Sequence, residues 1–392
     1  MHSAPSVAPP RVAVLADDLT SAGDGAAPFR RGGHQARVLL SGAPLVGHDL
    51  PGGVLAVDLG TRLLGEGEAE ARTREAASAL AGSGLLLKTV DSTLRGHVAA
   101  EIRAAWEGSG RRAVVVAPAF PAEGRTTRDG VQYVREVRVD ESEFAHDPVH
   151  PVRTADLARL LPVAVPIDAR QPERLSELLP GGGLFVCSAV TDADLDRIVA
   201  AVPDHRGVLW VGSPGLAAAL ARHHALPGAD AVPGRLPSAA RPLVAVGSAN
   251  PATRRQLALL AAEPGAVSAV AAGPLRAADT PVRILHTPHE RRADPADPSG
   301  PTRVLAASVA DLAARAPFDG LVVTGGETAE AVLRALGAHG IDLHDEPEPG
   351  IARGILAGPA GVPRVPVVIK AGGFGDDRTL LRLHALLTAR PA

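Results

Sequence analysis

The stretch GLLLKTVDSTLRGH, residues 84–97, carries the pattern that decides the expected fold. Its first part, Gly84–Thr89, is predicted to be a short buried strand because an apolar run of this length ends in polar residues. A polar turn around Asp91 follows, and a helix is predicted over Gly96–Trp106. A strand followed by a polar loop and a helix is the repeating unit of folds built on a parallel sheet.

The same alternation extends in both directions along the chain. Further strands are expected at Val12–Ala16, Val38–Leu40, Val54–Asp58, Ala113–Ala117, Leu184–Ser188, Val208–Val211, Leu243–Gly247, Gly320–Thr324 and Val365–Lys370. Further helices are expected at Ser21–Gly32, Glu66–Leu80, Asp192–Ala201, Gly215–His223, Pro251–Leu260, Glu327–Leu336 and Thr379–Thr388. The stretch Ala119–Pro151 is polar and weakly periodic, which is typical of a functional loop or of short strands that the pattern conceals.

The length of 392 residues favours two domains. Leu226–Pro242 is rich in proline and glycine and has no apolar period, so it is the predicted linker. The sequence therefore predicts two α/β domains, residues 11–228 and 241–392, each a mostly parallel sheet flanked by helices, with a cleft between them. Residues 1–10 are expected to be a loose tail, and residues 288–301 a surface loop.

Bulk properties exclude several classes of protein. The formal charge of −3 argues against a general nucleic-acid binder. No apolar run approaches the roughly 20 residues that span a bilayer, and the first residues do not resemble a signal peptide. The single cysteine, Cys187, cannot form an intrachain disulfide and is expected to be buried and inert. A cytoplasmic protein without nucleic-acid or membrane partners is the expectation, with a homodimer as the default assembly.

The chain contains only two lysines, Lys88 and Lys370, among 40 basic residues. Each closes an apolar strand-like run and opens a polar or glycine-rich turn. Lysine carries a compact ammonium that arginine cannot replace where a planar guanidinium does not fit. We expect both lysines to occupy positions of that kind.

Carboxylates gather in LADDLTSAGD, residues 15–24, where the first strand ends. Asp17, Asp18 and Asp24 lie where ligands bind in open α/β sheets. A carboxylate there can accept a proton from a substrate hydroxyl or hold a magnesium ion. Helix capping would explain one of the two adjacent aspartates and leave the other for function.

Two further turns of the first half offer polar and cationic groups. In KTVDSTLRGH, residues 88–97, Ser92 and Thr93 can donate to a substrate oxygen, and Arg95 can grip a carboxylate with two hydrogen bonds. In PAFPAEGRTTRDG, residues 118–130, Phe120 offers an apolar wall and Arg125 a second cation for an anionic group. A rigid surface loop is the competing interpretation of the second turn.

The second half has three glycine-containing turns at strand ends: GSANPAT (247–253), VTGGETA (323–329) and KAGGFGDD (370–377). Such turns let backbone N–H groups and a helix start face a phosphate. None matches a dinucleotide fingerprint or a P-loop, and the chain lacks the motifs of a zinc site. Three turns of this type in one domain favour a phosphate-rich ligand. The candidate residues are Ser248, Thr324, Gly325, Gly326, Glu327, Thr328, Lys370, Gly372 and Gly373.

These segments, in this order, resemble the four-carbon acid sugar kinases. The matching stretches are LADDLTSAGD, KTVDSTLRGH, APAFPAEGRTTRDGVQYV, FAHDPVHPV, WVGSPGLAAAL, VTGGETAEAVLRALG and VIKAGGFG, which together span residues 12–377. The chain departs from the family pattern at Leu19, at Ser21-Ala22, at Gly60-Thr61-Arg62 and at His97. The departures near Arg62 and His97 leave the specific acid open.

The resemblance implies an N-terminal domain that binds the acid sugar and a C-terminal domain that binds ATP. The implied reaction transfers the γ-phosphoryl group to the terminal hydroxyl (O4) of threonate, erythronate or 3-oxo-tetronate, with ATP and Mg²⁺ as cofactors. Asp18 or Asp91 would accept the hydroxyl proton, and Asp17 and Asp24 would support it or contact magnesium. The cations Arg62, Lys88 and Arg95 would bind the substrate carboxylate or the charge that builds on the phosphoryl group.

Two alternatives belong to other functional classes. One is a non-catalytic acid-sugar sensor that binds its ligand without consuming ATP. The other is an aldolase or isomerase that uses Lys88 as a Schiff base.

Overall fold

The computed structural model describes residues 10–45, 53–147, 150–226, 236–271, 282–288, 297, 299–315 and 317–389. Nearly all of the expected tail and most of the expected linker and of loop 288–301 lie outside these residues. The chain divides into two compact units. The first comprises Met1–Arg37 and Pro44–Ala231, and the second comprises Val38–Ala43 and Val232–Ala392. The predicted domain boundaries, residues 11–228 and 241–392, remain predictions.

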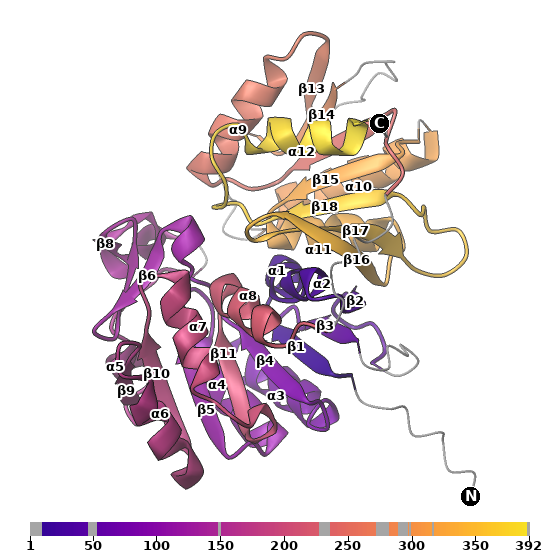
Figure 1. Cartoon of the computed structure of the whole chain (residues 1–392). Coiled ribbons are helices and arrows are strands. Elements are labelled where there is room, and N and C mark those ends of the chain that lie inside the picture. The colour runs from indigo at the N-terminus through magenta and orange to yellow at the C-terminus, as the bar shows by residue number, and fades with distance from the viewer. Residues whose placement is uncertain are drawn as a thin grey trace, which may run out of the picture. The chain divides into compact units, whose positions relative to one another are not determined.

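The first unit is built on a parallel sheet (Figure 1). Its strands are β1 (Val12–Ala16), β2 (Ala36–Leu39), β3 (Val54–Asp58), β4 (Leu85–Thr89), β5 (Ala113–Ala117), β9 (Val165–Asp168), β10 (Gly183–Ser188) and β11 (Val208–Gly212). They lie in the order β2-β3-β1-β4-β11-β5-β10-β9, and every pair from β3 to β9 is parallel. The last two residues of β2 belong to the second unit. The carboxyl ends of β3, β1 and β4 therefore meet at one edge of the sheet.

Helices cover both faces of this sheet. They are α1 (Leu19–Ala26), α2 (Pro28–Arg31), α3 (Glu66–Ala79), α4 (Val98–Ser109), α5 (Leu157–Leu160), α6 (Pro172–Leu178), α7 (Asp192–Ala200) and α8 (Pro214–His223). The pair α3 and α4 packs on one face, and α1, α2, α7 and α8 pack together on the other, as right-handed crossovers require (Figure 1). The predicted single helix Ser21–Gly32 is two helices instead, because Pro28 lacks the N–H that would continue the first.

The weakly patterned stretch 119–151 contains short strands. These are β6 (Arg125–Arg128), β7 (Val131–Val134) and β8 (Val137–Arg138), which form a small antiparallel sheet. The 3₁₀ turn Glu143–His146 follows. Strand β9 and helix α6 are also absent from the elements that the sequence predicts, since β9 is a four-residue edge strand that contains Pro166.

The second unit is an α/β sheet of mixed direction. Its strands are β12 (Pro242–Val246), β13 (Ala266–Val270), β14 (Val282–His286), β15 (Gly320–Thr324), β16 (Gly340–Glu348), β17 (Ile351–Ala357) and β18 (Pro366–Lys370). They lie in the order β13-β14-β12-β15-β18-β17-β16, with β17 antiparallel to both of its neighbours. The other pairs are parallel, so β12, β15 and β18 end at one edge.

Helices α9 (Pro251–Ala261) and α12 (Thr379–Thr388) pack together on one face of this second sheet. Helices α10 (Gly300–Arg315) and α11 (Gly326–Ala335) pack together on the other, as Figure 1 shows. The two-domain α/β class predicted from the sequence is confirmed. Within the described residues, no helix is both long and apolar enough to cross a bilayer. Cys187 is buried as predicted, and burial raises the pKa of its thiol to about 12.

Candidate functional site: an arginine–carboxylate cluster and three glycine turns

The loops after β1, β3 and β4 bring charged groups from three parts of the first unit together. Strand β1 pairs with β3 on one side and with β4 on the other, and Ala16 lies opposite Asp58. Each of the three loops leaves the sheet at the same edge, where ligands of open α/β sheets bind. The loop after β3 is held against the first by its backbone, because the N–H groups of Thr61 and Arg62 both donate to the carbonyl of Asp17.

Arg62 is the centre of this cluster. Its Nε lies 2.7 Å from Oδ2 of Asp17 and its Nη2 lies 2.9 Å from Oδ1, which is a bidentate pair. Its Nη1 donates to Asp18. Asp18 also caps helix α1, because its Oδ1 accepts from the N–H of Ser21 at 2.8 Å. Asp18 therefore caps the helix and also binds Arg62, whereas Asp17 forms the bidentate pair with that arginine.

Asp91 is the acidic centre of the loop after β4. Its Oδ1 accepts from the N–H and the hydroxyl of Thr93, at 2.7 and 2.6 Å, and its Oδ2 forms an ion pair with Arg95. The same oxygen lies 4.0 Å from Nη2 of Arg62, which joins this loop to the cluster. The guanidinium of Arg95 also lies over the ring of Phe144 at 5.3 Å. Its Nη1 lies 3.4 Å from Asp147.

These contacts fix the charge of the cluster. Burial alone would raise the pKa of Asp91, but the guanidiniums of Arg95 and Arg62 outweigh that effect. With the hydrogen bonds from Thr93 they hold the pKa of Asp91 well below its usual range. The pKa of Asp17 is likewise lowered against the effect of burial, chiefly by Arg62 and then by Lys88. Both carboxylates are therefore ionised at neutral pH and are strong hydrogen-bond acceptors.

Lys88 lies beneath the cluster and binds the chain itself. Its side chain is fully buried, and its Nζ lies 2.7 Å from Oε2 of Glu101 on α4. The same ammonium donates to the carbonyl of Thr89 at 2.7 Å. A Schiff base needs an accessible, neutral amine. An enclosed and ion-paired ammonium therefore argues against the aldolase alternative, and the predicted contact of Lys88 with a substrate stays a prediction.

The loop after β5 is tied to the loop after β4. The amide of Gln132, on β7, donates to the carbonyl of Ser92 at 2.8 Å and more weakly to that of Pro118 at 3.4 Å. Phe120 is buried, and its backbone pairs with that of Arg125. The guanidinium of Arg125 binds the carbonyl and, at 3.0 Å, the carboxylate of Glu123. Phe120, predicted as an apolar wall, and Arg125, predicted as a second cation, thus belong to one turn that is closed by its own backbone and side-chain contacts.

The structure brings most of the predicted residues of the first unit together. Asp17, Asp18, Arg62, Asp91 and Arg95 are in direct contact, and Ser92 and Thr93 lie in the same loop. Asp24 is buried within α1. No sequence pattern singles out the side chains that hold the cluster, namely Gln132, Phe144, Asp147 and Glu101. Only the unusual composition of residues 119–151 pointed to three of them.

The three glycine turns of the second unit also converge, because β12, β15 and β18 are adjacent. The N–H of Gly325 donates to the carbonyl of Lys370 at 2.9 Å. A Cβ at Gly372 would lie 2.1 Å from Oγ of Ser248, and one at Gly247 would lie 1.9 Å from Oγ1 of Thr328. The glycines are therefore required for the three turns to approach one another.

Helix α11 begins within this group of turns. Its N-cap, Gly325, has a φ of 92°, and no side chain caps the helix. The start of the helix therefore lacks the usual side-chain cap and suits a phosphate. Gly373 lies in the third turn beside Gly372.

Lys370 is fully buried like Lys88. Its ammonium donates to the carbonyls of Ala371 and Phe374, each at 2.9 Å. It thereby fixes the turn after β18, and a contact of Lys370 with a phosphate stays a prediction. Thr324 is buried at the end of β15, beside this turn.

The described residues offer no group of three or more His, Cys, Asp or Glu side chains arranged to hold a metal ion. A protein-built cage for Mg²⁺ is thus absent from that part of the chain. Magnesium in kinases is commonly held by one or two carboxylates together with the phosphates of the nucleotide. The carboxylates beside Arg62 and Arg95 are engaged by these guanidiniums, and a magnesium contact of Asp17 or Asp24 stays a prediction.

Comparison with known proteins assigns the chain to a family. Residues 12–220 match the family described as sugar-binding N-terminal domain, and residues 288–380 match the nucleotide-binding C-terminal domain. A protein of Bordetella bronchiseptica named D-threonate kinase is 37% identical, over 97% of this chain and 98% of its own. One of Methylobacterium radiotolerans named 3-oxo-tetronate kinase is 32% identical, over 92% of this chain and 95% of its own.

A solved structure also covers nearly the whole chain. It is a crystal structure from Bordetella bronchiseptica of a domain of unknown function, described as a domain-swapped dimer with bound citrate. It is 36% identical to this chain, covers 97% of it and 99% of the solved chain, and superposes with a TM-score of 0.52. With the arginine–carboxylate cluster and the converging glycine turns, these similarities show that the chain belongs to the four-carbon acid sugar kinases, a family of sugar-acid kinases.

Proposed function

We propose that the protein transfers the γ-phosphoryl group of ATP to the terminal hydroxyl (O4) of a four-carbon acid sugar. The observation that carries this proposal is the cluster in which Arg62 and Arg95 are held by Asp17, Asp18 and Asp91 at the strand ends of the first unit. An acid sugar has a carboxylate that needs cationic donors and hydroxyls that need acceptors. The cluster presents both kinds of group in fixed positions.

Arg95 is the residue best suited to bind the substrate carboxylate. Its side chain is 28% exposed, whereas that of Arg62 is 17% exposed and engages two aspartates. Its contacts with Asp91 and Phe144 hold the guanidinium in place before the substrate arrives. Prior ordering of this kind lowers the entropy lost on binding. Ser92 and the closed turn containing Phe120 and Arg125 would border the same acid.

Asp18 or Asp91 would accept the proton of the attacking hydroxyl. The low pKa of Asp91 makes it a weak base but a firm acceptor of a hydrogen bond. That is sufficient for phosphoryl transfer, in which alignment and neutralisation of charge contribute more than proton abstraction. Asp17 would then keep Arg62 oriented, and Lys88 would help to keep Asp17 ionised from beneath.

The second unit would bind ATP at its three glycine turns. The uncapped first turn of α11 would receive phosphate oxygens, and Gly325 and Gly372 let the turns that carry Ser248 and Lys370 pack closely beside it. Ser248 would donate its hydroxyl, and Lys370 would act indirectly by fixing the third turn. When bound with ATP, Mg²⁺ would neutralise charge on the phosphates.

D-Threonate is the substrate that we place first, because the relative of 37% identity carries that name. D-Erythronate and 3-oxo-tetronate follow as alternatives. We further propose that the enzyme works in the cytoplasm, where ATP is available. A homodimer is the proposed assembly, since a solved relative is described as a dimer.

The direct test is ADP release with ATP, Mg²⁺ and each of these acids. We expect turnover with one of them. Arg95→Gln should raise KM about tenfold or more, because a charge-assisted hydrogen bond to the substrate is lost. Asp91→Asn should lower kcat by about a hundredfold or more. Asp168→Asn, which changes an exposed ion pair on the edge strand β9, is the matched control and should leave both constants unchanged. Ligand-induced stabilisation without any turnover would instead favour an acid-sugar sensor.

A further inference from the structure

The first unit has a pocket of about 580 Å³ at the opposite edge of its sheet from the arginine–carboxylate cluster. Its floor contains Val12 and Leu85, the first residues of β1 and β4. Each strand is five residues long, which at about 3.3 Å per residue places the pocket roughly 15 Å from the cluster. A volume of this size is typical of sites for small organic ligands.

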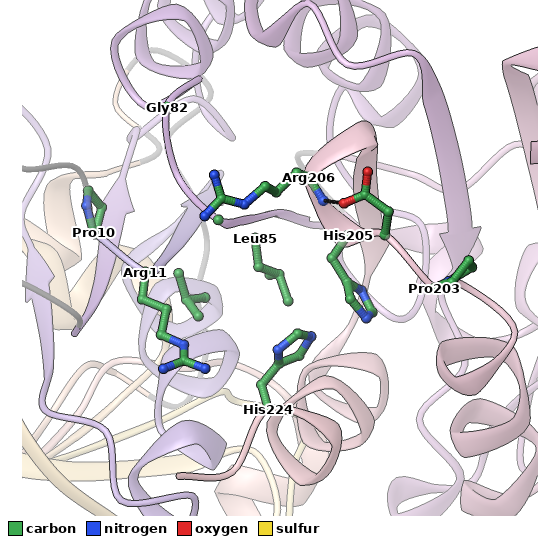
Figure 2. Close-up of a pocket in the computed structure, with 11 residues that line it drawn as sticks. Pro10, Arg11, Gly82, Leu85, Pro203, His205, Arg206 and His224 are labelled. Carbon is green, nitrogen blue, oxygen red and sulfur yellow. Dashed lines mark hydrogen bonds between the residues drawn. The ribbon is translucent and has the colours of Figure 1, made fainter. Parts of the chain in front are cut away.

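Two arginines line the pocket without being neutralised. Figure 2 shows the guanidinium groups of Arg11 and Arg206 on one side of it. Neither side chain forms an ion pair or hydrogen bond with any of the residues that the structure describes. The one acid in the lining is Asp204, whose Oδ1 accepts from the backbone N–H of Arg206 at 3.0 Å and caps the turn His205–Gly207. The lining therefore carries a net positive charge.

The opposite side consists of two imidazole rings, those of His205 and His224 (Figure 2). The ring centroids are 4.3 Å apart, and the rings meet edge to face. The indole N–H of Trp210 donates to Nδ1 of His205 at 3.1 Å, so the ring hydrogen of a neutral His205 lies on Nε2. Nε2 of His224 is buried and has no partner among the described residues. The free Nε2–H of His205 is therefore the ring donor that a ligand could use, whereas Nε2 of His224 is enclosed and out of its reach.

A buried arginine fixes the walls. Arg111 donates through Nη2 to the carbonyls of Ala81 and Ser83, at 3.1 and 2.6 Å, and through Nη1 to that of Arg206. The loop before β4 and the turn before β11 are thereby both hydrogen-bonded to the same side chain, that of Arg111. The pocket is consequently a fixed feature of the fold and not a gap between independent loops.

We propose that this pocket binds a small organic oxyanion, with its phosphate or carboxylate groups between Arg11 and Arg206 and its carbon skeleton over Leu85. Unpaired guanidiniums bind such groups through charge-assisted hydrogen bonds. The Nε2–H of His205 supplies a further donor. Because the site lies at the other end of the strands from the cluster, its ligand is separate from the substrate.

The test follows tryptophan fluorescence of the full-length protein while glycerol phosphate or citrate is added. The sequence contains two tryptophans, Trp106 and Trp210, and each contacts a residue that shapes the pocket. Comparing the phosphate with the carboxylate identifies the preferred anion, and glycerol serves as the uncharged control. The titrations are made on an Arg95→Gln background, which weakens binding of the anion at the candidate substrate site.

We expect saturable binding of at least one anion. Arg11→Gln and Arg206→Gln should each weaken it about tenfold, and the double variant should abolish it. The control is Arg174→Gln, which changes an exposed arginine of α6 that does not line the pocket. Equal affinity in the double variant, an equal loss in the control, or no saturable response to either anion would overturn the proposal.

Discussion

At the scale of single residues, the two lysines show how composition can point to structure. Both side chains are fully buried. The ammonium of Lys88 binds the carbonyl of Thr89 at the end of β4, and that of Lys370 binds two carbonyls of the turn that follows it. The sequence indicated positions where a compact ammonium is required, and their surroundings agree with that interpretation. The sequence did not indicate the partner of Lys88. Glu101 lies on helix α4, beyond the loop that follows β4, and no motif distinguishes it from other helical glutamates.

The ion pair of Lys88 and Glu101 predicts a large, asymmetric effect of mutation. Lys88→Met leaves a buried carboxylate unpaired and should lower the free energy of unfolding of the first unit by about 3–5 kcal/mol. Lys88→Met combined with Glu101→Leu should recover most of that loss. Urea unfolding followed by tryptophan fluorescence measures both.

The control for this experiment is Arg74→Met. Arg74 and Glu107 also lie 2.7 Å apart, but their side chains are 44% and 51% exposed, so the loss should stay within about 1 kcal/mol. A double variant that is no more stable than Lys88→Met alone would show that the stabilising role assigned to the pair is wrong. If that double variant folds but binds the acid poorly, Lys88 contacts the substrate after all.

His224 predicts how stability responds to acid. Burial, helped by His205 and Arg11, holds the pKa of its ring at about 4, below the usual value of about 6.5. Between these values the unfolded chain takes up a proton that the folded chain does not bind. The first unit should therefore lose stability as the pH falls from about 6.5 to about 4.

His224→Gln should reduce the stability difference between pH 7 and pH 5 by about 1 kcal/mol, a figure lowered to allow for the partial exposure of the ring. Urea unfolding at the two pH values measures it. His223→Gln changes the exposed neighbouring histidine, a lesser cause of the low pKa of His224, and should leave most of the difference in place. An identical pH dependence in His224→Gln and the wild-type protein would contradict the account.

At the scale of elements, the turns at strand ends were largely predictable, whereas their supports were not. Apolar runs ending in Asp17-Asp18, in Asp91 and in Gly325-Gly326 indicate strands whose polar ends meet, since parallel strands end at one edge. Strand β16 contains Pro347 and several acidic residues, a composition that indicates a loop. It forms nevertheless because its antiparallel partner β17 supplies the ladder of hydrogen bonds.

The glycine turns predict a steric effect at the start of α11. A Cβ at Gly247 would lie 1.9 Å from Oγ1 and 2.6 Å from Cγ2 of Thr328. Gly247→Ala should push the helix away, destabilise the second unit by about 2–4 kcal/mol and weaken ATP binding. The loss of stability would appear as faster hydrogen exchange of the backbone amides of β12 and β15.

A matched control for this effect is Gly67→Ala. Gly67 lies in helix α3, and a Cβ at that position would meet nothing within 4 Å, so alanine there should be neutral or slightly stabilising. Unchanged exchange in Gly247→Ala would mean that the turn adapts without loss. The close approach would then have no part in forming the site.

At the scale of the whole molecule, the sequence indicated two α/β domains, and family similarity supplied what each is for. The residue patterns alone indicate only an enzyme that binds one anionic ligand and one phosphate-rich ligand. The kinase assignment needs the order of the motifs along the chain and the match of both family regions. The sequence could not predict that Val38–Ala43 belongs to the second unit, because this assignment depends on contacts that form only in the folded chain.

The most direct test of the central claim is phosphorus NMR of the product formed from ATP, Mg²⁺ and D-threonate. The account predicts a new phosphate-ester signal split into a triplet by the two hydrogens on C4, together with ADP in equal amount. A signal split by a single hydrogen would place the phosphate on another hydroxyl. Free phosphate alone, or no change with D-threonate, D-erythronate and 3-oxo-tetronate in turn, would contradict the assignment as a four-carbon acid sugar kinase.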